Sequence, residues 1–419
     1  MGMLPKSGAK TAVRAKAPEP LHCAAAPTRR NPRRRVGHRR MPAVAIIGTR
    51  GYPSYYGGFE TAVRRLSPFL VEHGWDVTVY GRPGATDPAD PERDPRVVSR
   101  MTKGVDSKAL STLSYGFTST FDAARRRPDV ALIMNVANGF WLPLLRARGI
   151  PTIVNVDGLE WEREKWSALG KAVFRAGAKV TAKWSTERVV DAHTIGDAWE
   201  SKFGVGGTFI PYGADVPAPL PIEPGFTHRG YALVVARFVP ENTVGQFFDA
   251  AERLAETHDV IVVGSSGYGG DLDDRAAALA ERLPRFHWLG HVHDDHRLHS
   301  LWQHAGAYFH GHSVGGTNPA LVQAMAAGAP IVARDTVHSR EVLGADAGEF
   351  TGATPSEIEA ALRGLLTNPA RQQQLSENAV RRAVDAYSWE SVNAAYERLL
   401  RSHLRPVEGS PHPSEKRAR

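Results

Sequence analysis

The stretch that decides the fold reads HGHSVGGTNPALVQAMAAGAPIVARD and runs from His310 to Asp335. A glycine-rich loop leads into Asn318-Pro319, a helical pattern follows over Ala320–Ala327, and an apolar strand pattern covers Pro330–Ala333. Asn is a preferred N-cap residue and Pro is favoured at the first helical position, so a helix should begin here. The free N–H groups and the dipole at a helix start favour a bound anion. The segment therefore indicates either an anion-binding loop or a tight loop of an α/β domain.

Outward from this stretch, strand and helix patterns alternate along two halves of the chain. Such alternation is typical of parallel sheets wound by βαβ units. The strands expected in the first half are Val44–Ile47, Val77–Tyr80, Val130–Asn135, Thr152–Val156 and Gly207–Ile210, with helices over Phe59–His73, Ser107–Arg126, Phe140–Ala147 and Trp161–Val190. Those of the second half are Tyr231–Ala236, Val260–Gly264, Phe286–Leu289 and Ala307–Phe309, with a helix over Val244–Glu256.

Length and composition suggest two or three domains, because a domain usually holds ~100–200 residues. The Pro-rich, aperiodic stretch after Pro211 reads as a linker. The expected division is a disordered basic tail (1–40), a first Rossmann-like domain (41–212), a linker (213–229), a second Rossmann-like domain (230–386), a closing helix (387–402) and a disordered tail (403–419). Two such halves create a cleft, where ligands preferentially bind.

The net charge of +8 is concentrated at the N-terminal end. Residues 1–40 hold eleven Lys and Arg against one Glu, whereas residues 41–419 hold 41 basic and 43 acidic residues. The folded part is therefore close to neutral, which argues against nucleic-acid binding. The tail has no apolar signal-peptide core, so we expect either an extension upstream of a start at Met41 or a basic arm that attracts anionic lipid.

The only cysteine, Cys23, lies in this tail, so the rest of the chain has no disulfide or cysteine ligand, which fits a cytoplasmic protein. No apolar run approaches the ~20 residues that cross a bilayer.

Two further local features bear on ligand binding. The loop GTRGYPSYYGG (Gly48–Gly58) follows the first strand, but its glycine spacing does not match GxGxxG, so a dinucleotide fingerprint is not supported. Arg237 follows the first strand of the second half, where a guanidinium could hold a diphosphate in bidentate fashion or form a surface salt bridge.

Together these strings resemble the retaining GT-B glycosyltransferases of family 4. The resemblance rests on ARFVPEN around Arg237 and on SVGGTNPALVQAMAAGAPIVA. IIGTRGYPSYYGGFETAVRRL and NVDGLEWEREKW are similar to a rhamnosyltransferase-like branch that builds bacterial surface polysaccharides. IPYGAD resembles the entry to the linker, and YSWESVNAAYERLL resembles a closing helix that crosses back to the first domain.

The resemblance implies an α/β GT-B fold, a nucleotide-diphosphate sugar held by the second domain and a glycan acceptor approaching from the first. Arg237 and the N–H groups of Gly316 and Thr317 would stabilise charge on the leaving diphosphate, which is the largest kind of contribution in such chemistry. The donor-binding residues implied are Gly57, Gly58, Gly264, His312, Ser313, Gly315, Gly316, Thr317, Asn318 and Gln323. Asp157 is the second catalytic candidate.

Three positions depart from the family pattern. Many family-4 enzymes carry a Glu at each end of an E-x7-E element, and these positions are Gly315 and Gln323 here. A Lys is frequent five residues after the Arg, and this position is Asn242. The diphosphate charge would therefore rest more heavily on Arg237 and on helix dipoles.

The acceptor-side candidates are Arg50, Tyr52, Glu160 and Trp161. Asp157 and Glu160 follow a strand that should face the cleft, and each could instead cap a helix at Trp161. The indole of Trp161 could stack on a sugar or lie in the core. Glu60 could be a ligand or a helix first-turn residue.

A metal site is not expected. Asp271 and Asp273 form a DxD string but precede a helical run, where acidic residues suit the dipole. The pairs His310/His312 and His291/His293 lack a third ligand at suitable spacing.

The resemblance, taken with these observations, implies a retaining hexosyltransferase that needs no metal or cofactor and transfers a deoxyhexose such as rhamnose. A lipid-pyrophosphate acceptor would suit a cytoplasmic protein that contacts the inner face of the membrane. Two alternatives stay open: a GT-B-shaped sugar-nucleotide epimerase, and a catalytically weak nucleotide-sugar-binding subunit.

Overall fold

The computed structural model describes residues 40–404 except 56, 106–110, 164–165 and 268. The tails that the sequence predicts to be disordered thus lie almost wholly outside the described residues. The described residues from Met41 onward form one compact unit. It holds two parallel sheets in its described part, the first built from strands between residues 43 and 209 and the second from strands between 231 and 351.

The first sheet has the strand order β3-β2-β1-β4-β5-β6-β7, and every neighbouring pair is parallel. We call this sheet with helices α1–α5 the first lobe. Its strands are β1 (Ala43–Ile47), β2 (Asp76–Gly81), β3 (Val98–Met101), β4 (Val130–Met134), β5 (Thr152–Asn155), β6 (Glu187–Val190) and β7 (Thr208–Phe209). Its helices are α1 (Gly58–Glu72), α2 (Ser111–Arg126), α3 (Leu142–Arg146), α4 (Ala168–Trp184) and α5 (His193–Phe203), with 3-10 turns at Val136–Trp141 and Glu160–Glu162.

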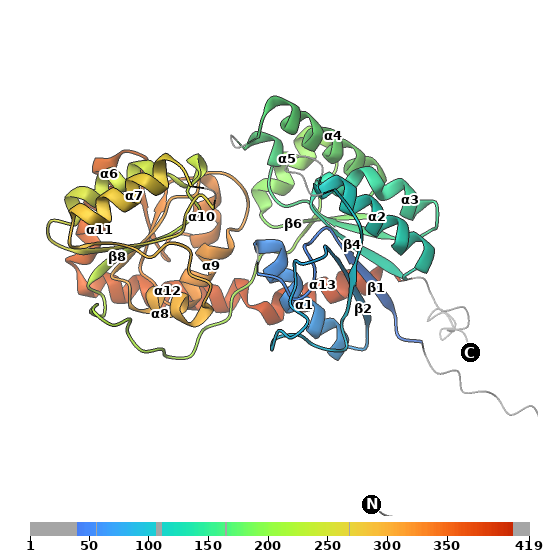
Figure 1. Ribbon diagram of the computed structural model, residues 1–419, viewed down its shortest axis with the longest axis horizontal. Coiled ribbons are helices and arrows are strands. Elements are labelled where there is room, and N and C mark those ends of the chain that lie inside the picture. Colours follow the sequence, from blue (N-terminus) through green and yellow to red (C-terminus); the bar gives the residue numbers. More distant parts are fainter. Residues whose placement is uncertain (1–39, 56, 106–110, 164–165, 268, 405–419) are drawn as a thin grey trace, which may run out of the picture. The chain divides into compact units, whose positions relative to one another are not determined.

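Alternate residues of each strand point to opposite faces of this sheet, which explains its two cores. Val44 and Ile46 of β1 pack in the same cluster as α1 and the last helix, α13 (Trp389–Ser402). Ala45 and Ile47 pack in the cluster of α2, α3, α4 and α5. Figure 1 shows these two groups of helices on opposite sides of the sheet.

The second sheet has the order β10-β9-β8-β11-β12-β13 and is also parallel throughout. We call this sheet with helices α6–α12 the second lobe. Its strands are β8 (Tyr231–Val235), β9 (Asp259–Val263), β10 (Phe286–Trp288), β11 (Ala307–His310), β12 (Ile331–Arg334) and β13 (Glu349–Thr351). Its helices are α6 (Val244–Leu254), α7 (Asp271–Arg282), α8 (Asp295–His304), α9 (Pro319–Ala326), α10 (Val337–Leu343), α11 (Pro355–Leu366) and α12 (Pro369–Tyr387), with a 3-10 turn at Pro240–Asn242.

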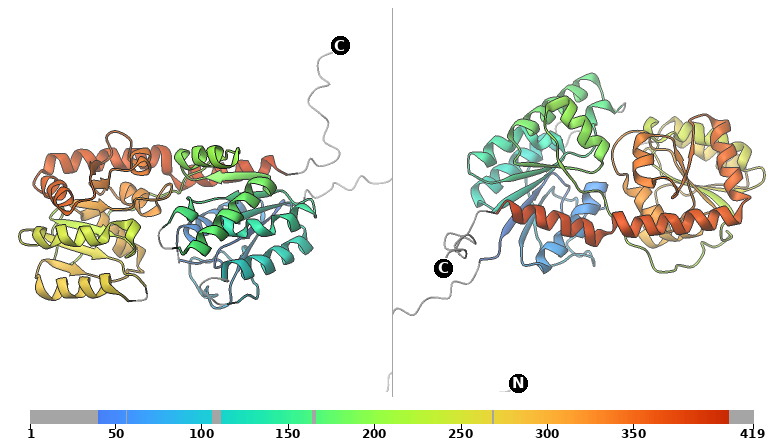
Figure 2. Two further views of the ribbon diagram at one scale, coloured as in Figure 1. Left: turned by 90° about the horizontal axis from the view of Figure 1, so that it is seen from above. Right: turned by 180° about the vertical axis from the view of Figure 1, so that it is seen from behind.

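The last helix returns to the first lobe, as expected. Figure 2 shows α12 continuing into α13. α13 packs against α1, and the Asn155 Nδ2 at the end of β5 donates to the Tyr396 hydroxyl at 2.7 Å. The predicted α/β GT-B architecture is therefore confirmed, whereas the expected domain boundaries at 212 and 230 stay predictions.

One long helix was predicted wrongly. The pattern over Trp161–Val190 suggested continuous helix, but the chain forms a 3-10 turn at Glu160–Glu162, then α4, and then strand β6. Ser167 caps α4, because its hydroxyl accepts from the Gly170 N–H at 3.3 Å. Asp157 and Glu160 consequently do not cap a helix at Trp161. Both carboxylates instead form ion pairs with Arg163.

Candidate functional site

The order in which strands are added to the second sheet reverses between β8 and β11. These two strands are adjacent in the sheet, although helices α6, α7 and α8 and strands β9 and β10 separate them in sequence. In open parallel sheets, ligands bind beyond the carboxyl ends of the strands at such a switch point. β8 ends at Val235 and leads to Arg237, while β11 ends at His310 and leads to the loop Gly311–Thr317. The topology thus brings together the two motifs that the sequence singled out.

The 3-10 turn Pro240–Asn242 supports this loop from beneath. The Glu241 carbonyl accepts hydrogen bonds from the N–H and the hydroxyl of Ser313, at 2.9 and 3.0 Å. The Thr243 hydroxyl donates to the Gly311 carbonyl at 2.7 Å. A Cβ added to Gly311 would lie only 2.2 Å from the Asn242 carbonyl oxygen, so a glycine is required there.

Helix α9 begins where the sequence predicted. The Asn318 side chain accepts from the Ala320 N–H at 2.9 Å, and Pro319 occupies the first turn. Gly315 has a φ of +118°, a conformation that favours glycine. Gln323 lies on the same helix and is half-buried, with no side-chain hydrogen bond to the described residues.

Arg237 is exposed at the end of β8, and no described residue forms an ion pair with its guanidinium. The surface salt bridge that the sequence left open is therefore not found among the described residues. Gly264, at the end of β9, has a φ of +129°, and a Cβ there would lie 1.8 Å from the Ala236 carbonyl oxygen. Because Gly264 has no side chain, the backbone of Ala236 can pack directly against it. Gly264 thus helps to position Arg237, the residue that follows Ala236.

His310 at the end of β11 and His312 in the loop both have lowered pKa values, which favour the uncharged imidazole at neutral pH. Burial lowers the pKa of His310 to about 4, and its ring faces the Tyr308 hydroxyl at 3.4 Å. Burial, followed by the neighbouring His310 and the guanidinium groups of Arg163 and Arg237, lowers the pKa of His312 well below its usual value. The His312 Nδ1 lies 2.6 Å from the Asn242 Oδ1.

A second group of charged residues lies at the carboxyl end of β5 in the first lobe. Arg163 forms ion pairs with Glu160 at 2.6 Å and with Asp157 at 3.8 Å. Burial, the largest influence, lowers the pKa of Arg163, but the carboxylates of Glu160 and Asp157 outweigh it and the pKa is raised. A Cβ added to Gly315 would lie 3.7 Å from the Arg163 Nη2, so this guanidinium reaches the loop of the second lobe.

Asp157 itself is held in an uncommon conformation. Its φ is +56°, its N–H donates to the Asn155 Oδ1 at 2.9 Å, and its side chain is 20% exposed. Backbone strain of this kind in a non-glycine residue is concentrated at functional sites. Asp157 therefore combines partial exposure with a fixed orientation.

Asp191, at the end of β6, is the residue that joins the two lobes most directly. Its carbonyl accepts a hydrogen bond from the Thr317 hydroxyl, and its carboxyl lies against Gly316. Asp191 as a whole is 2% exposed, and its Oδ1 has no hydrogen-bond partner among the described residues. Burial, followed by the nearby Asp157 carboxylate, raises the pKa of Asp191 well above its usual value.

The starts of α1 and α9 also meet. A Cβ added to Gly58 would lie 3.0 Å from the Pro319 Cγ and 3.3 Å from the Tyr212 Cζ. Gly57 precedes Gly58 as the N-cap residue of α1. The N-terminus of α1 in the first lobe thus lies next to the N-terminus of α9 in the second.

The acceptor-side candidates are distributed differently from the expectation. Tyr52 is 1% exposed, and its hydroxyl accepts from the Asp94 N–H at 3.2 Å. Trp161 is 3% exposed and packs edge-on against Trp199 and Phe203. Both rings lie in the core, because burying a large aromatic surface stabilises the lobe. We therefore do not retain them as acceptor contacts.

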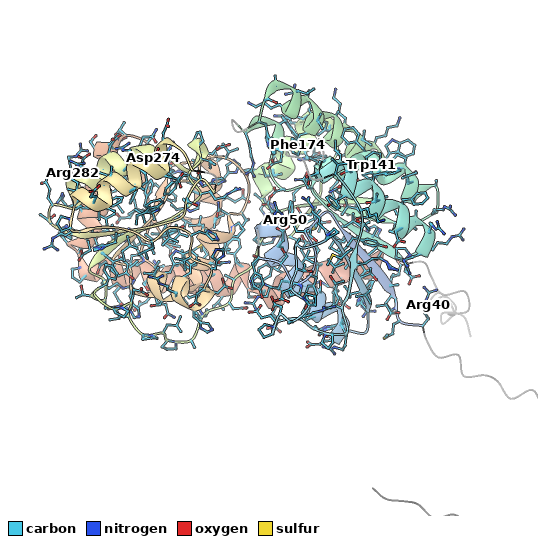
Figure 3. The ribbon with its side chains drawn as sticks, in the orientation of Figure 1. Arg40, Arg50, Trp141, Phe174, Asp274 and Arg282 are labelled. Carbon is cyan, nitrogen blue, oxygen red and sulfur yellow. The ribbon has the colours of Figure 1, made fainter. Side chains whose placement is uncertain are left out.

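Glu160 and Arg50 have structural partners. Glu160 is 4% exposed, and its Oε2 accepts from the Trp166 indole N–H at 2.8 Å in addition to the ion pair with Arg163. The Arg50 N–H donates to the Glu60 Oε1 at 3.2 Å, so the side chain of Glu60, in the first turn of α1, binds the loop that precedes this helix. Arg50 is half-buried and lies beside the start of α1 (Figure 3).

Sequence reasoning missed Arg163 and Asp191. Asp191 directly follows a strand, a position that would have marked it had β6 been recognised. Arg163 had no such local signal, because its partners in the second lobe are distant in sequence.

The DxD string lies in the first turn of α7, where the Asp273 carboxylate accepts from the Ser266 N–H at 3.2 Å. Within the described ranges, no group of three or more His, Cys, Asp or Glu side chains is placed to hold a metal ion. None of the described helices combines the length and apolar character of a membrane-spanning helix.

Two family models match the chain. One is that of the glycosyl transferases group 1, over residues 223–382, and the other is the glycosyl transferase 4-like domain, over residues 57–213. The chain is also 27% identical to the MMP alpha-(1->4)-mannosyltransferase of Mycolicibacterium hassiacum, over 84% of its own length and 96% of that relative.

Solved structures share the fold. Sucrose-phosphate synthase from Thermosynechococcus elongatus superposes with a TM-score of 0.71 at 18% identity and covers 86% of this chain and 98% of its own. Anabaena HepE in complex with UDP-glucose superposes with a TM-score of 0.67 at 14% identity, covering 86% and 100%. The two matched domains and the paired parallel sheets with their returning helix lead to one conclusion: the chain carries a glycosyl transferase 4-like domain and a glycosyl transferases group 1 domain on an α/β GT-B fold.

Proposed function

We propose that the protein is a retaining hexosyltransferase that moves a deoxyhexose such as rhamnose from a nucleotide-diphosphate sugar to a glycan acceptor in surface-polysaccharide synthesis. The single observation that carries the proposal is the convergence of Arg237, the loop Gly311–Thr317 and the start of α9 at the switch point of the second sheet. The choice of rhamnose rests on the resemblance of the GTRGYPSYYGGFE and HGHSVGGTNP strings to one branch of the family.

In this proposal the diphosphate lies between the Arg237 guanidinium and the main chain of Gly316 and Thr317. Ser313, Gly315 and Asn318 shape the loop around it rather than carry charge. A guanidinium forms strong bidentate hydrogen bonds with phosphate oxygens, and a helix N-terminus adds a positive partial charge. Charge that develops on the leaving diphosphate is stabilised by groups that are already in place, which is the main requirement of the transfer.

The first lobe would supply the acceptor side. Gly57 and Gly58 begin α1 next to Pro319 and let the two chains approach closely. Asp157 is partly exposed and fixed by its strained backbone, which suits a carboxylate that hydrogen-bonds an acceptor hydroxyl. Arg50 is the second acceptor-side candidate, because it is half-buried beside the start of α1.

We further propose that the transfer needs no metal, because Arg237 and the two helix N-termini can balance the diphosphate charge. Turnover should be unchanged when the enzyme is assayed in excess EDTA. A loss of turnover that added Mg²⁺ or Mn²⁺ restores would contradict this part of the proposal.

Two experiments test the proposed function. The first measures thermal stabilisation by dTDP-, UDP- and GDP-sugars, because a ligand at 100 times its dissociation constant stabilises the folded protein by ~2.7 kcal/mol. The second follows slow donor hydrolysis without acceptor. A transferase releases free sugar and nucleotide diphosphate, an epimerase interconverts donors, and a binding subunit does neither. Either of the last two outcomes would refute the proposal.

A lipid-linked acceptor would bring the protein to an anionic membrane, and the surface of α4 suits such contact. Lys171, Arg175, Lys179 and Lys183 recur at intervals of four residues, and α4 carries no acidic residue. Leu169 at the start of α4 is 76% exposed. α4 packs against α3 and α3 against α2, whose Phe117 and Phe121 are exposed. Figure 3 labels Trp141 and Phe174 on this side of the first lobe.

Sedimentation with vesicles tests this surface. Each Lys or Arg near an anionic membrane contributes ~1 kcal/mol, so the double charge reversal Arg175→Glu, Lys179→Glu should weaken binding to phosphatidylglycerol vesicles by roughly tenfold or more. Arg381→Glu, on α12 of the second lobe, is the matched control. Equal binding to neutral phosphatidylcholine vesicles, or no effect of the double variant, would refute the assignment.

A further inference from the structure

A chain of hydrogen bonds fixes which way the Asn242 amide faces. Its Nδ2 lies 2.8 Å from the Arg237 carbonyl oxygen, which can only accept. The Asn242 Oδ1 consequently faces the His312 Nδ1, at 2.6 Å. Because an amide oxygen carries no proton, the His312 Nδ1 must donate this bond. Asn242 is 8% exposed, so the protein rather than solvent determines the orientation.

The surroundings keep the His312 ring uncharged. The titratable and charged groups that face it are His310 at the end of β11, Arg163 of the first lobe, Arg237 after β8 and His338 on α10. Burial and these groups all act against a second proton on the ring. A neutral imidazole with its proton on Nδ1 has a lone pair on Nε2, so Nε2 can accept a hydrogen bond but cannot donate one.

The His312 Nε2 points toward the glycine loop. A Cβ added to Gly315 would lie 3.4 Å from it, and no described residue donates a hydrogen bond to it. The His312 side chain is only half-buried, so a ligand seated in the loop can reach this nitrogen.

We propose that the His312 Nε2 accepts a hydrogen bond from a hydroxyl of the sugar nucleotide, and that Asn242 is the positioning residue that holds His312 in this tautomer. The inference rests on the proposed function and names a specificity-determining contact within it. A diphosphate oxygen has no proton at neutral pH, so it cannot be the partner of Nε2. Arg237 therefore binds the diphosphate of the sugar nucleotide, and His312 binds one of its hydroxyl groups.

The tautomer can be measured without substrate. In the full-length protein with ¹⁵N-labelled histidine, the NMR signals of His312 should show a protonated Nδ1 and an unprotonated Nε2. The variant His312→Phe identifies the signals. A proton found on Nε2 would overturn the inference even if the protein transfers sugar normally.

Ligand binding separates the hydroxyl of the sugar from that of the ribose. Wild type should bind a donor that lacks the contacted hydroxyl about tenfold more weakly, since one hydrogen bond contributes about this factor. The two arms use donors deoxygenated on the hexose and donors deoxygenated on the ribose. His312→Phe should bind the parent and the matching deoxy donor equally, whereas the control His296→Phe, at an exposed position of α8, should keep the full preference.

The variant Asn242→Asp tests whether Asn242 holds His312 in this tautomer. An Asp carboxylate at this position also accepts from Nδ1, but its charge favours the doubly protonated ring and turns Nε2 into a donor. This variant should therefore bind the parent donor and the matching deoxy donor with a smaller difference in affinity than wild type does. Binding of sugar nucleotides with no such change in preference, in both Asn242→Asp and His312→Phe, would refute the inference while leaving the proposed function intact. Failure of wild type to bind any sugar nucleotide would instead refute the function.

Discussion

The contact between Gly316 and Asp191 makes Gly316→Ala an informative substitution. The added Cβ would lie 2.0 Å from the Asp191 Oδ1 and 2.5 Å from its Cγ, far inside the closest approach of real atoms. Asp191 is 2% exposed, so its carboxyl cannot turn out into solvent. Gly316 does not have a positive φ, so alanine brings no backbone strain of its own.

The expected cost follows from these distances. Overpacking a buried site typically costs about 1–3 kcal/mol, and a glycine-to-alanine change returns ~0.4–1 kcal/mol by restricting the unfolded chain. We therefore expect Gly316→Ala to lower the free energy of unfolding by roughly 1–2 kcal/mol. Donor turnover should fall as well, because the loop that docks on β6 is the one proposed to hold the diphosphate.

A double-mutant cycle isolates the cause. Asp191→Ala removes the clashing carboxyl, so Gly316→Ala should cost little in that background, with a coupling energy of about 0.5–3 kcal/mol in urea denaturation. Gly364→Ala is the control, because nothing lies within 4 Å of its added Cβ and it sits inside helix α11. If Gly316→Ala were as stable as wild type, or equally destabilising with and without Asp191, the packing of the two lobes described above would be wrong.

Three further predictions concern the same region. Arg237→Ala should cut turnover by roughly tenfold or more with folding intact, since one stabilising donor commonly contributes a few kcal/mol; near-normal steady-state rates would exclude the assigned role. The raised pKa of Asp191 means that the folded protein keeps a proton that the unfolded chain has released above about pH 4, so stability should fall as pH rises through that window. Asp191→Asn should remove this slope between pH 5 and 8 in urea denaturation, and an unchanged slope would contradict the pKa shift. Gly264→Ala places a Cβ 1.8 Å from the Ala236 carbonyl, so it should destabilise by about 2 kcal/mol or more, and a variant of unchanged urea midpoint would argue against this packing.

Much of the architecture could be predicted from periodic signals along the sequence. Short apolar runs such as VALIM at β4 and AYFH at β11 lie inside the sheets, and such runs are typical of buried strands. Asn318-Pro319 marked the start of α9, because capping is a local interaction that the sequence displays directly. Gly311, Gly315 and Gly316 could also be recognised from the sequence, because a loop in which chains approach closely needs residues without a Cβ.

The charged part of the site could not be predicted in this way. β6 reads ERVV, with two charged residues in four, and it follows a helix without a breaking glycine or proline. The contact between Arg163 and the loop at Gly315 joins residues more than a hundred positions apart in sequence, so no local pattern displays it. Trp161 was ambiguous because an indole suits a sugar and a core equally well, and only its packing against Trp199 and Phe203 decides the matter.

The return of α13 to the first lobe has a consequence for synthesis on the ribosome. The strands of that lobe are complete at Phe209, but the surface that receives Val392, Tyr396 and Leu400 stays uncovered until some 180 further residues have been translated. At ~5–20 residues per second this leaves an apolar groove open on the nascent chain for roughly 10–40 s. A premature stop before α13 would thus damage the part of the protein that was made first, and chaperones should be needed most during that interval.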